Sequence, residues 1–321
     1  MDQVTFVKNF ALCKEVGIAG KFIYDGMRDL NIIRNYVDTD NIFGFLYKIS
    51  VGIERLQKIA YILLKNPTAD EFEEIEKEII THSHVGLQEK ISSLTKTELN
   101  KHQLSFLHLL TRFYNSSRYD RFNLSTSLHN EQDLLIEYIQ DRLNIKIKMH
   151  SFFVPPLEDK VKKFLGKVII GLTRFLYDLI SNEARKIGIY THELSSESKS
   201  LKVFLATDGK NSLQDQIIDE QIALKEFLIF LMNTKETSEM FNFIKEIPPL
   251  DIDMGMLQEY LSEIIKSEIP QQLIDELEYL YEDIDIKERL EMLECVGNPY
   301  CDISQDEDFE EYEPFEPSTT S

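Results

Sequence analysis

The sequence predicts an all-α protein, a helical bundle made of two helical halves. Apolar residues recur about every 3.6 positions through several long segments, which is the pattern of an amphipathic helix. With 12 Gly and 9 Pro among 321 residues, the chain has few of the turn residues that all-β folds consume. Leu, Ile, Lys and Glu, which tolerate helix well, dominate the periodic segments, and the hydrophobic content of 43% supports a packed core.

The first half, residues 1–143, is predicted to contain a helical hairpin. The segment Asn41 to Asn66 keeps its apolar period for more than five turns, and Pro67 stops it. Thr68 followed by acidic residues is typical of a helix N-terminus, so a helix is expected through the 70s. Another helix is expected to begin near Thr97, and a shorter one spans 129–143.

The second half is predicted to follow a connecting segment at 144–159, where a period of two and Pro155-Pro156 disfavour helix. Residues 160–301 form this half, and its first helix carries an apolar stripe that we expect in the core. The short apolar run at 201–208 would be a strand if it found a partner. Further helices are expected at 213–246, 253–268 and 270–295. The tail, 302–321, has eight acidic and no basic residues and is predicted to be disordered.

The acidity of the chain belongs to its C-terminal third. The formal net charge is −21, yet residues 1–200 carry 27 Lys and Arg against 26 Asp and Glu. Residues 201–321 carry 8 against 30. A polyanion such as nucleic acid would therefore be repelled by the last third of the chain but not by the first two.

The sequence lacks the usual signatures of several classes of protein. No run approaches the ~18 apolar residues of a membrane span, and the start resembles no signal peptide, so we expect a cytoplasmic protein without a membrane partner. The three cysteines lack paired spacing and suggest reduced thiols. There is no GxGxxG, Walker A, GxSxG or HExxH motif, and no cofactor is predicted. His82 and His84 read as surface polar residues at a turn rather than metal ligands.

A cluster of arginines and aromatic rings, RFYNSSRYDRFN, spans residues 112–123. Arg112, Arg118 and Arg121 would hold phosphates if they line a groove, and Tyr119 would stack on a base. The alternative is structural, because Asp120 is available to neutralise one arginine and the neighbouring rings would pack in the core. Both interpretations stay open on the sequence.

A second candidate site lies in the other half. Arg185 and His192 are seven residues apart, which is two turns along one face if a helix continues through Gly188. An imidazole can move the proton of an RNA 2′-hydroxyl, and a guanidinium can stabilise the charge that develops on the phosphorane. Lys162 and Lys163, in the lysine-rich segment 146–167, would add a basic surface. An arginine and a histidine at this spacing are also expected by chance.

The segments GIERLQKIAYILL and THSHVGLQEKI and the RY-containing arginine cluster, all within 41–123, resemble the HEPN superfamily of small all-α bundles from prokaryotic toxin and antiphage-defence systems. The resemblance implies RNA binding, a homodimer and metal-independent endoribonuclease activity, whose signature is Arg, four to six residues, then His. Arg185 and His192 match that spacing, although they lie outside the resembling segment. HEPN-like domains without the motif bind RNA, nucleotides or a partner. The alternative function is a non-catalytic helical adaptor whose acidic C-terminal region binds a partner protein.

Overall fold

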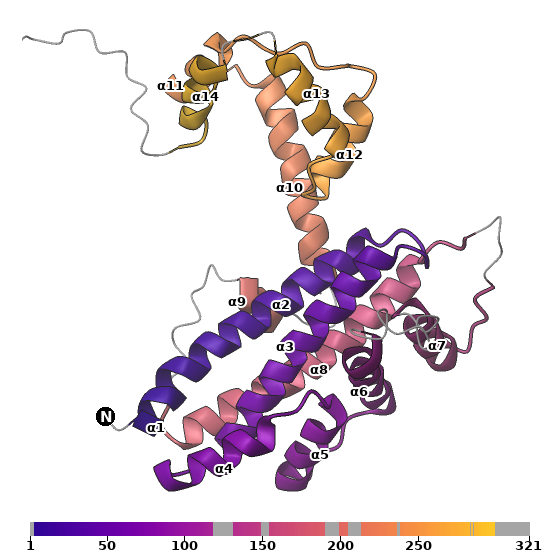
Figure 1. Ribbon diagram of the computed structural model, residues 1–321, viewed down its shortest axis with the longest axis vertical. Coiled ribbons are helices and arrows are strands. Elements are labelled where there is room, and N and C mark those ends of the chain that lie inside the picture. The colour runs from indigo at the N-terminus through magenta and orange to yellow at the C-terminus, as the bar shows by residue number, and fades with distance from the viewer. Residues whose placement is uncertain are drawn as a thin grey trace, which may run out of the picture. The chain divides into compact units, whose positions relative to one another are not determined.

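The structure of the chain is a computed structural model (Figure 1). It describes residues 3–117, 131–148, 154–189, 199–204, 213–235, 238–282, 284 and 286–298. Throughout these residues the regular secondary structure is helical, and the one β-bridge joins Asn35 to Pro156, so the all-α prediction is confirmed. The predicted acidic tail at 302–321 lies outside them. The chain divides into two compact units, Met1–Glu220 and Gln221–Ser321.

The first unit contains the helices that follow in chain order. They are α1 (Gln3–Phe6), the π-helical turn η1 (Val7–Ala11), α2 (Leu12–Ile32), α3 (Thr39–Lys65), α4 (Ala69–Ile79), α5 (His84–Thr95), α6 (Lys101–Arg112), the π-helical turn η2 (Phe113–Ser117), α7 (Glu131–Leu143), α8 (Asp159–Lys186), α9 (Lys199–Phe204) and the first residues of α10 (Leu213–Asn233). The run at 201–208, for which a strand was the alternative, is helical over its described part, with Val203 and Phe204 buried.

Helix α3 forms the centre of this unit, and α2 lies along it (Figure 1). Two glycines allow the close approach of the two helices. A Cβ at Gly52 would lie 2.6 Å from Cγ1 of Ile23 and 3.0 Å from the carbonyl oxygen of Ala19. A Cβ at Gly26 would lie 2.8 Å from Cδ1 of Ile49. A Cβ at Gly52 would therefore force α2 or the Ile23 side chain to move, and one at Gly26 would force the Ile49 side chain to move.

The ends of the helices follow the capping signals closely. Helix α3 ends at Asn66, whose φ of 44° is left-handed, one residue before the proline that was expected to stop it. Thr68 and Glu71 form the capping box of α4, with the Thr68 amide donating to Glu71 Oε2 at 2.9 Å. Helix α6 begins later than expected because Asn100, rather than Thr97, caps it by accepting from the amides of His102 and Gln103.

Helix α8 packs directly against α3, so the segment 144–159 is a connection inside the first unit. The apolar stripe predicted for this helix is in the core, where Leu165, Ile169, Leu172 and Leu176 are fully buried. The Leu157 amide donates to the Arg34 carbonyl at 3.0 Å and ties the connection to the end of α2. The division into two compact units falls at 220–221.

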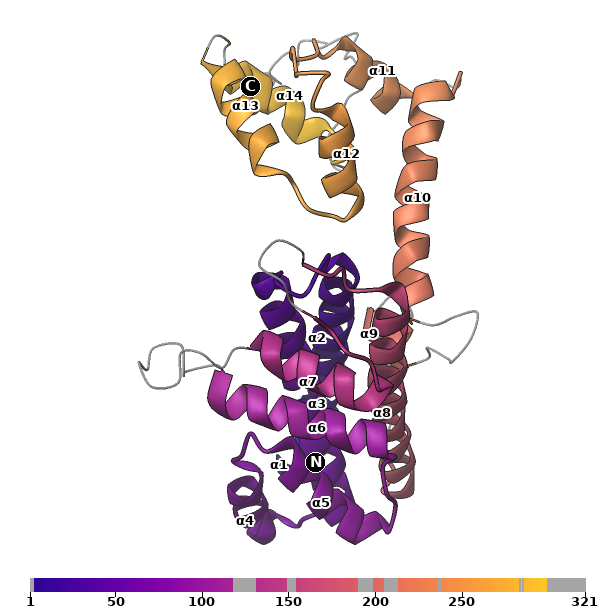
Figure 2. The same ribbon diagram turned by 90° about the vertical axis from the view of Figure 1, so that its right-hand side faces the viewer.

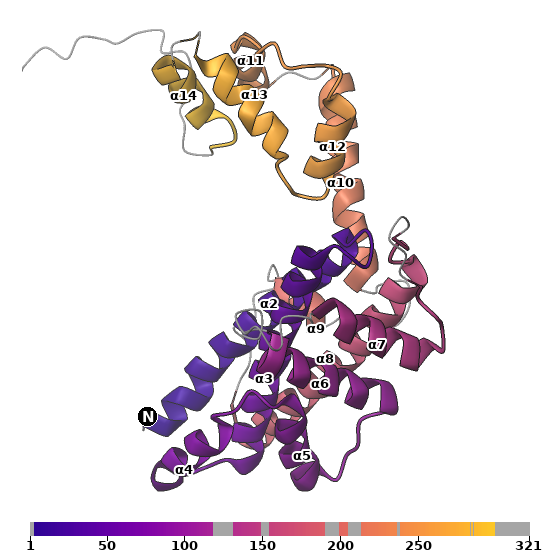
Figure 3. The same cartoon turned by 45° about the vertical axis from the view of Figure 1, so that its right-hand side comes forward.

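The second unit continues α10 and adds α11 (Glu239–Glu246), α12 (Leu257–Ile265), α13 (Gln271–Tyr281) and α14 (Ile286–Cys295), all visible in Figure 3. Two of the long helices predicted here are interrupted, since 213–246 contains α10 and α11 and 270–295 contains α13 and α14, whereas 253–268 contains the single, shorter α12. Cys295 is disulfide-bonded whereas Cys13 is a buried thiol outside any disulfide, so the prediction of reduced thiols holds for Cys13 and is wrong for Cys295. Among the described residues no helix is long and apolar enough to cross a membrane.

Candidate nucleic-acid interface

Four cationic side chains lie along the exposed face of α8. Its buried residues occupy one side of the helix, and Lys163, Lys167, Arg174 and Arg185 are exposed on the other. Spacings of four, seven and eleven residues return to one face of a helix, so these four side chains form a single row, here called the α8 stripe. At a rise of about 1.5 Å per residue the row is about 33 Å long.

The surroundings of the α8 stripe leave its charges uncompensated. None of the ion pairs within the described residues involves its four side chains. Lys160, at the start of the same face, is paired with Glu158 at 2.7 Å, and Asp178 is the one exposed carboxylate on this face between Lys163 and Arg185. The α8 stripe is therefore a mainly positive surface on a strongly acidic protein.

Helices α6 and α9 border the α8 stripe on its two flanks. The ring of Phe164 meets His102 of α6 edge to face at 5.6 Å between centroids. On the other flank Tyr177 stacks on Phe204 of α9 at 4.3 Å. Burial raises the pKa of Tyr177, and the nearby Arg185 guanidinium opposes this rise. These ring contacts hold the cationic face in a fixed orientation between its neighbours.

The structure separates the predicted site residues. Lys163 and Arg185 belong to the α8 stripe, whereas Lys162 lies on the side of α8 that faces the end of α2. There its Nζ donates to the Asn31 carbonyl at 2.7 Å, and burial lowers its pKa. The remaining predicted residues, Arg118, Tyr119, Arg121 and His192, lie outside the described residues.

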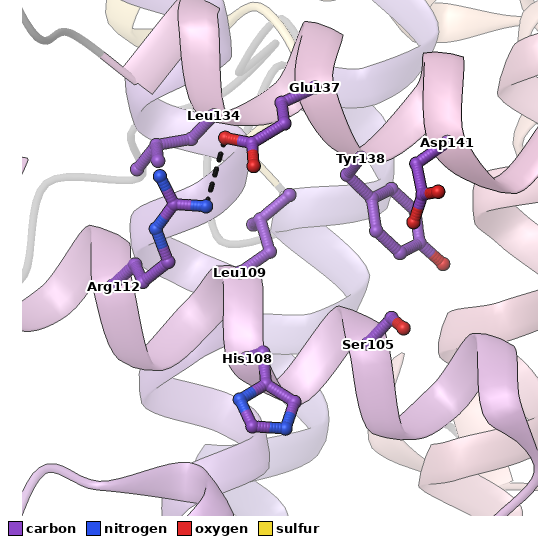
Figure 4. A pocket seen from close by; sticks show the side chains of 8 residues that line it. All are labelled: Ser105, His108, Leu109, Arg112, Leu134, Glu137, Tyr138 and Asp141. Carbon is purple, nitrogen blue, oxygen red and sulfur yellow. Dashed lines mark hydrogen bonds and ion pairs between the residues drawn. The ribbon is translucent and has the colours of Figure 1, made fainter.

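Arg112 lines a separate groove of about 290 Å³ between α6 and α7 (Figure 4). These two helices run side by side in Figure 2. Arg112 Nη1 contacts Glu137 Oε2 at 2.9 Å. His108, one turn before Arg112, lines the same groove, and Asp141 adds a second carboxylate from α7. Because both carboxylates repel phosphate, this groove suits a phosphate less well than the α8 stripe does.

Buried polar groups join α3 to α5. His84 is fully buried, so the prediction that both histidines are surface residues is wrong for it. Its Nε2 lies 2.9 Å from the Ser50 carbonyl, and its own carbonyl accepts from Gln57 Nε2 at 2.9 Å. Burial lowers the pKa of His84 despite the hydrogen bond to Ser50 and the nearby Glu54 carboxylate, which both raise it. Burial therefore favours the neutral imidazole of His84 in the core.

His82 lies at the edge of the same region and is half exposed. Its Nδ1 is 3.1 Å from Oε2 of Glu54, whose other oxygen is paired with Lys58 at 2.7 Å. The ring of Tyr114 lies 4.5 Å from the His82 ring. A carboxylate that accepts from Nδ1 leaves Nε2 as the basic nitrogen. The sequence marked this site only through the two histidines, and it gave no sign of Glu54 or Tyr114.

No metal site accompanies these groups in the described part of the chain, where no three His, Cys, Asp or Glu side chains are grouped so as to hold an ion. Comparison with family models, with curated proteins and with solved structures found no match to the chain. The HEPN resemblance therefore stays a prediction, and function is inferred from the geometry.

Proposed function

We propose that the protein binds single-stranded RNA along the α8 stripe. The observation that carries the proposal is the row of four exposed cations, interrupted by one carboxylate, on a chain whose net charge is −21. Like charges held in a row repel one another, and a phosphate backbone lying along them relieves that repulsion while releasing its condensed counterions. The length of the row suits an extended strand rather than a single phosphate group.

The mode of recognition follows from the side chains present. The α8 stripe is a row of exposed cationic side chains on one helix face. Contacts of this kind position a nucleic acid through its backbone and carry no sequence information. Support for RNA over DNA comes from the HEPN resemblance, which also supports a role in a prokaryotic defence or toxin system.

Lysine footprinting tests the binding site directly. The full chain is treated with an amine-acylating reagent with and without a single-stranded RNA oligonucleotide, and modification is read by mass spectrometry. RNA is expected to protect Lys163 and Lys167 while Lys77 and Lys96, exposed elsewhere in the first unit, react as before. Equal reactivity of all four lysines with and without RNA would reject the proposed surface.

The resemblance extends the proposal to metal-independent cleavage, with Arg185 stabilising the phosphorane and His192 transferring protons. Incubation with RNA in EDTA tests this extension, because a metal-dependent contaminant is then inactive. Cleavage that His192→Ala abolishes, with RNA binding retained, supports the assignment. Cleavage that instead depends on His82 would move the acid–base role to the imidazole held by Glu54. Intact RNA with wild-type protein would reject cleavage and leave the binding proposal standing.

A further inference from the structure

The second unit leaves many of its large apolar side chains exposed. Phe227, Ile229, Phe230 and Met232 of α10 are each between 52% and 83% exposed. Among the described residues of this unit Tyr260 and Pro270 are the buried apolar residues, and α11, α13 and α14 bury none. Large apolar surface on this scale is characteristic of an interaction site.

Helix α10 has the clearest exposed apolar surface of the second unit. Residues 227–232, FLIFLM, are six consecutive apolar residues, so they project on every side of the helix. A helix that is apolar all round is normally covered on all sides. The rings of Phe227 and Phe230 stack on one another with centroids 6.4 Å apart and 19° between planes, which presents a flat aromatic surface to the solvent. The sequence of α10 is that of a covered helix, yet Phe227, Ile229, Phe230 and Met232 are each more than half exposed.

The charge of the unit decides what can cover it. Residues 221–321 contain 6 Lys and Arg against 26 Asp and Glu. Acids also alternate with exposed apolar residues on α13 and α14, where Glu278 precedes Tyr279 and Glu291 and Glu294 flank Leu293. A second copy would bring an equal negative charge, and RNA or an anionic membrane would be repelled in the same way. A cationic partner is attracted.

We propose that the second unit is a docking surface for a cationic amphipathic helix of another protein. Apolar side chains of that helix cover Phe227 and Phe230, and its lysines and arginines pair with the surrounding carboxylates. Apolar anchors give most of the affinity in such helix-in-groove complexes, while complementary charge raises the association rate and selects the partner. This proposal concerns a different unit from the α8 stripe and does not depend on RNA binding.

Two synthetic helical peptides of equal length and lysine content provide the probe. One carries leucine at positions i, i+3, i+4 and i+7, and the other carries serine at those positions. Fluorescence anisotropy with the full chain is expected to show binding of the leucine peptide at least tenfold tighter than that of the serine peptide. Equal affinities would mean that the acidic residues alone attract cations, which overturns the proposed docking surface.

The double variant Phe227→Ser with Phe230→Ser tests the anchors. Both side chains are exposed, so the fold is expected to persist, and the variant is expected to lose the tenfold preference for the leucine peptide. Ile80→Ser, at an 80% exposed position in the first unit, is the matched control and should keep that preference. An unchanged preference in the double variant would overturn the assignment of the anchors.

Sedimentation velocity and vesicle flotation test the two other possible occupants of the docking surface, a second copy of the chain and a lipid surface. The proposal expects the wild-type chain without peptide not to self-associate through Phe227 and Phe230 and not to float with zwitterionic phosphatidylcholine vesicles. Self-association that the double variant removes would identify a second copy as the occupant. Flotation that the double variant removes would identify a lipid surface. Either result would overturn a cationic protein helix as the partner.

Discussion

Neutralising the α8 stripe should reduce both the affinity for RNA and its dependence on salt. Replacing Lys163, Lys167, Arg174 and Arg185 by glutamine removes four exposed cations, none of which has an ion-pair partner among the described residues. The fold is therefore expected to tolerate the change, since surface substitutions of this kind usually alter stability by about 0.5 kcal/mol or less. The part of the RNA affinity that is lost should be electrostatic and independent of the RNA sequence.

The magnitude follows from counterion release. For single strands the slope of log K against log salt is about −0.7 per neutralised phosphate, so four contacts contribute a slope of about −3. Between 50 and 200 mM salt, wild-type affinity should then fall by about 50-fold through these contacts alone. The quadruple variant should lose this part of the dependence, and a fluorescence titration with a labelled oligonucleotide at several salt concentrations measures both slopes.

A charge-matched control distinguishes a site from general electrostatics. Lys21, Lys65, Lys77 and Lys96 are exposed on other parts of the first unit, and replacing them by glutamine changes the net charge of the protein by about the same amount. If the α8 stripe is the binding surface, this control keeps the wild-type slope. Similar slopes in both quadruple variants would refute the reasoning, because only net charge would then matter.

The remaining predictions concern stability and are measured by chemical denaturation. Gly52→Ala should lower the free energy of unfolding by about 1–3 kcal/mol because its Cβ would meet the α2 backbone, whereas Gly17→Ala, with nothing within 4 Å, should leave it unchanged or raise it. Asn100→Ala should cost about 1 kcal/mol through loss of the α6 cap. Burial lowers the pKa of His84 in the folded state below its unfolded value of about 6.5, so below that pH the unfolded state binds more protons. The free energy of unfolding should therefore fall as the pH is lowered below about 6.5, by up to about 1.4 kcal/mol per pH unit. His84→Gln should remove this pH dependence of stability, whereas His108→Gln, at an exposed site, should keep it. If His84→Gln also keeps it, the assignment to His84 is contradicted.

The sequence was sufficient for the helices that carry their own signals. Helix α3 has a long period and a proline after its end, and α4 has a capping box, so both lie where they were predicted. Helix α2 is absent from the sequence-based predictions because Gly17, Gly20 and Gly26 lower its intrinsic helix propensity. Its stability comes from packing on α3, where small residues permit close approach, and packing of that kind is not visible in local sequence.

The candidate interface was only partly predictable from the sequence, because helix register and tertiary packing decide which side chains are exposed. The apolar period of α8 already implied an opposite polar face, but register decides which lysines belong to it. Lys162 and Lys163 are adjacent in sequence and point in directions about 100° apart on a helix, so one binds the Asn31 carbonyl while the other is exposed. Likewise, the contact of His82 with Glu54 joins residues 28 positions apart and depends on the packing of α5 on α3.

The hydrogen bonds between α3 and α5 also constrain how this protein can diverge. Gln57 donates to the backbone of His84, and His84 in turn reaches the Ser50 carbonyl, all within the dry interior. Replacing either side chain leaves the buried backbone carbonyl that it reaches unpaired, at a cost of about 1–3 kcal/mol. Positions 57 and 84 are thus each expected to resist apolar substitution in descendants of this chain, whatever residue stands at the other position.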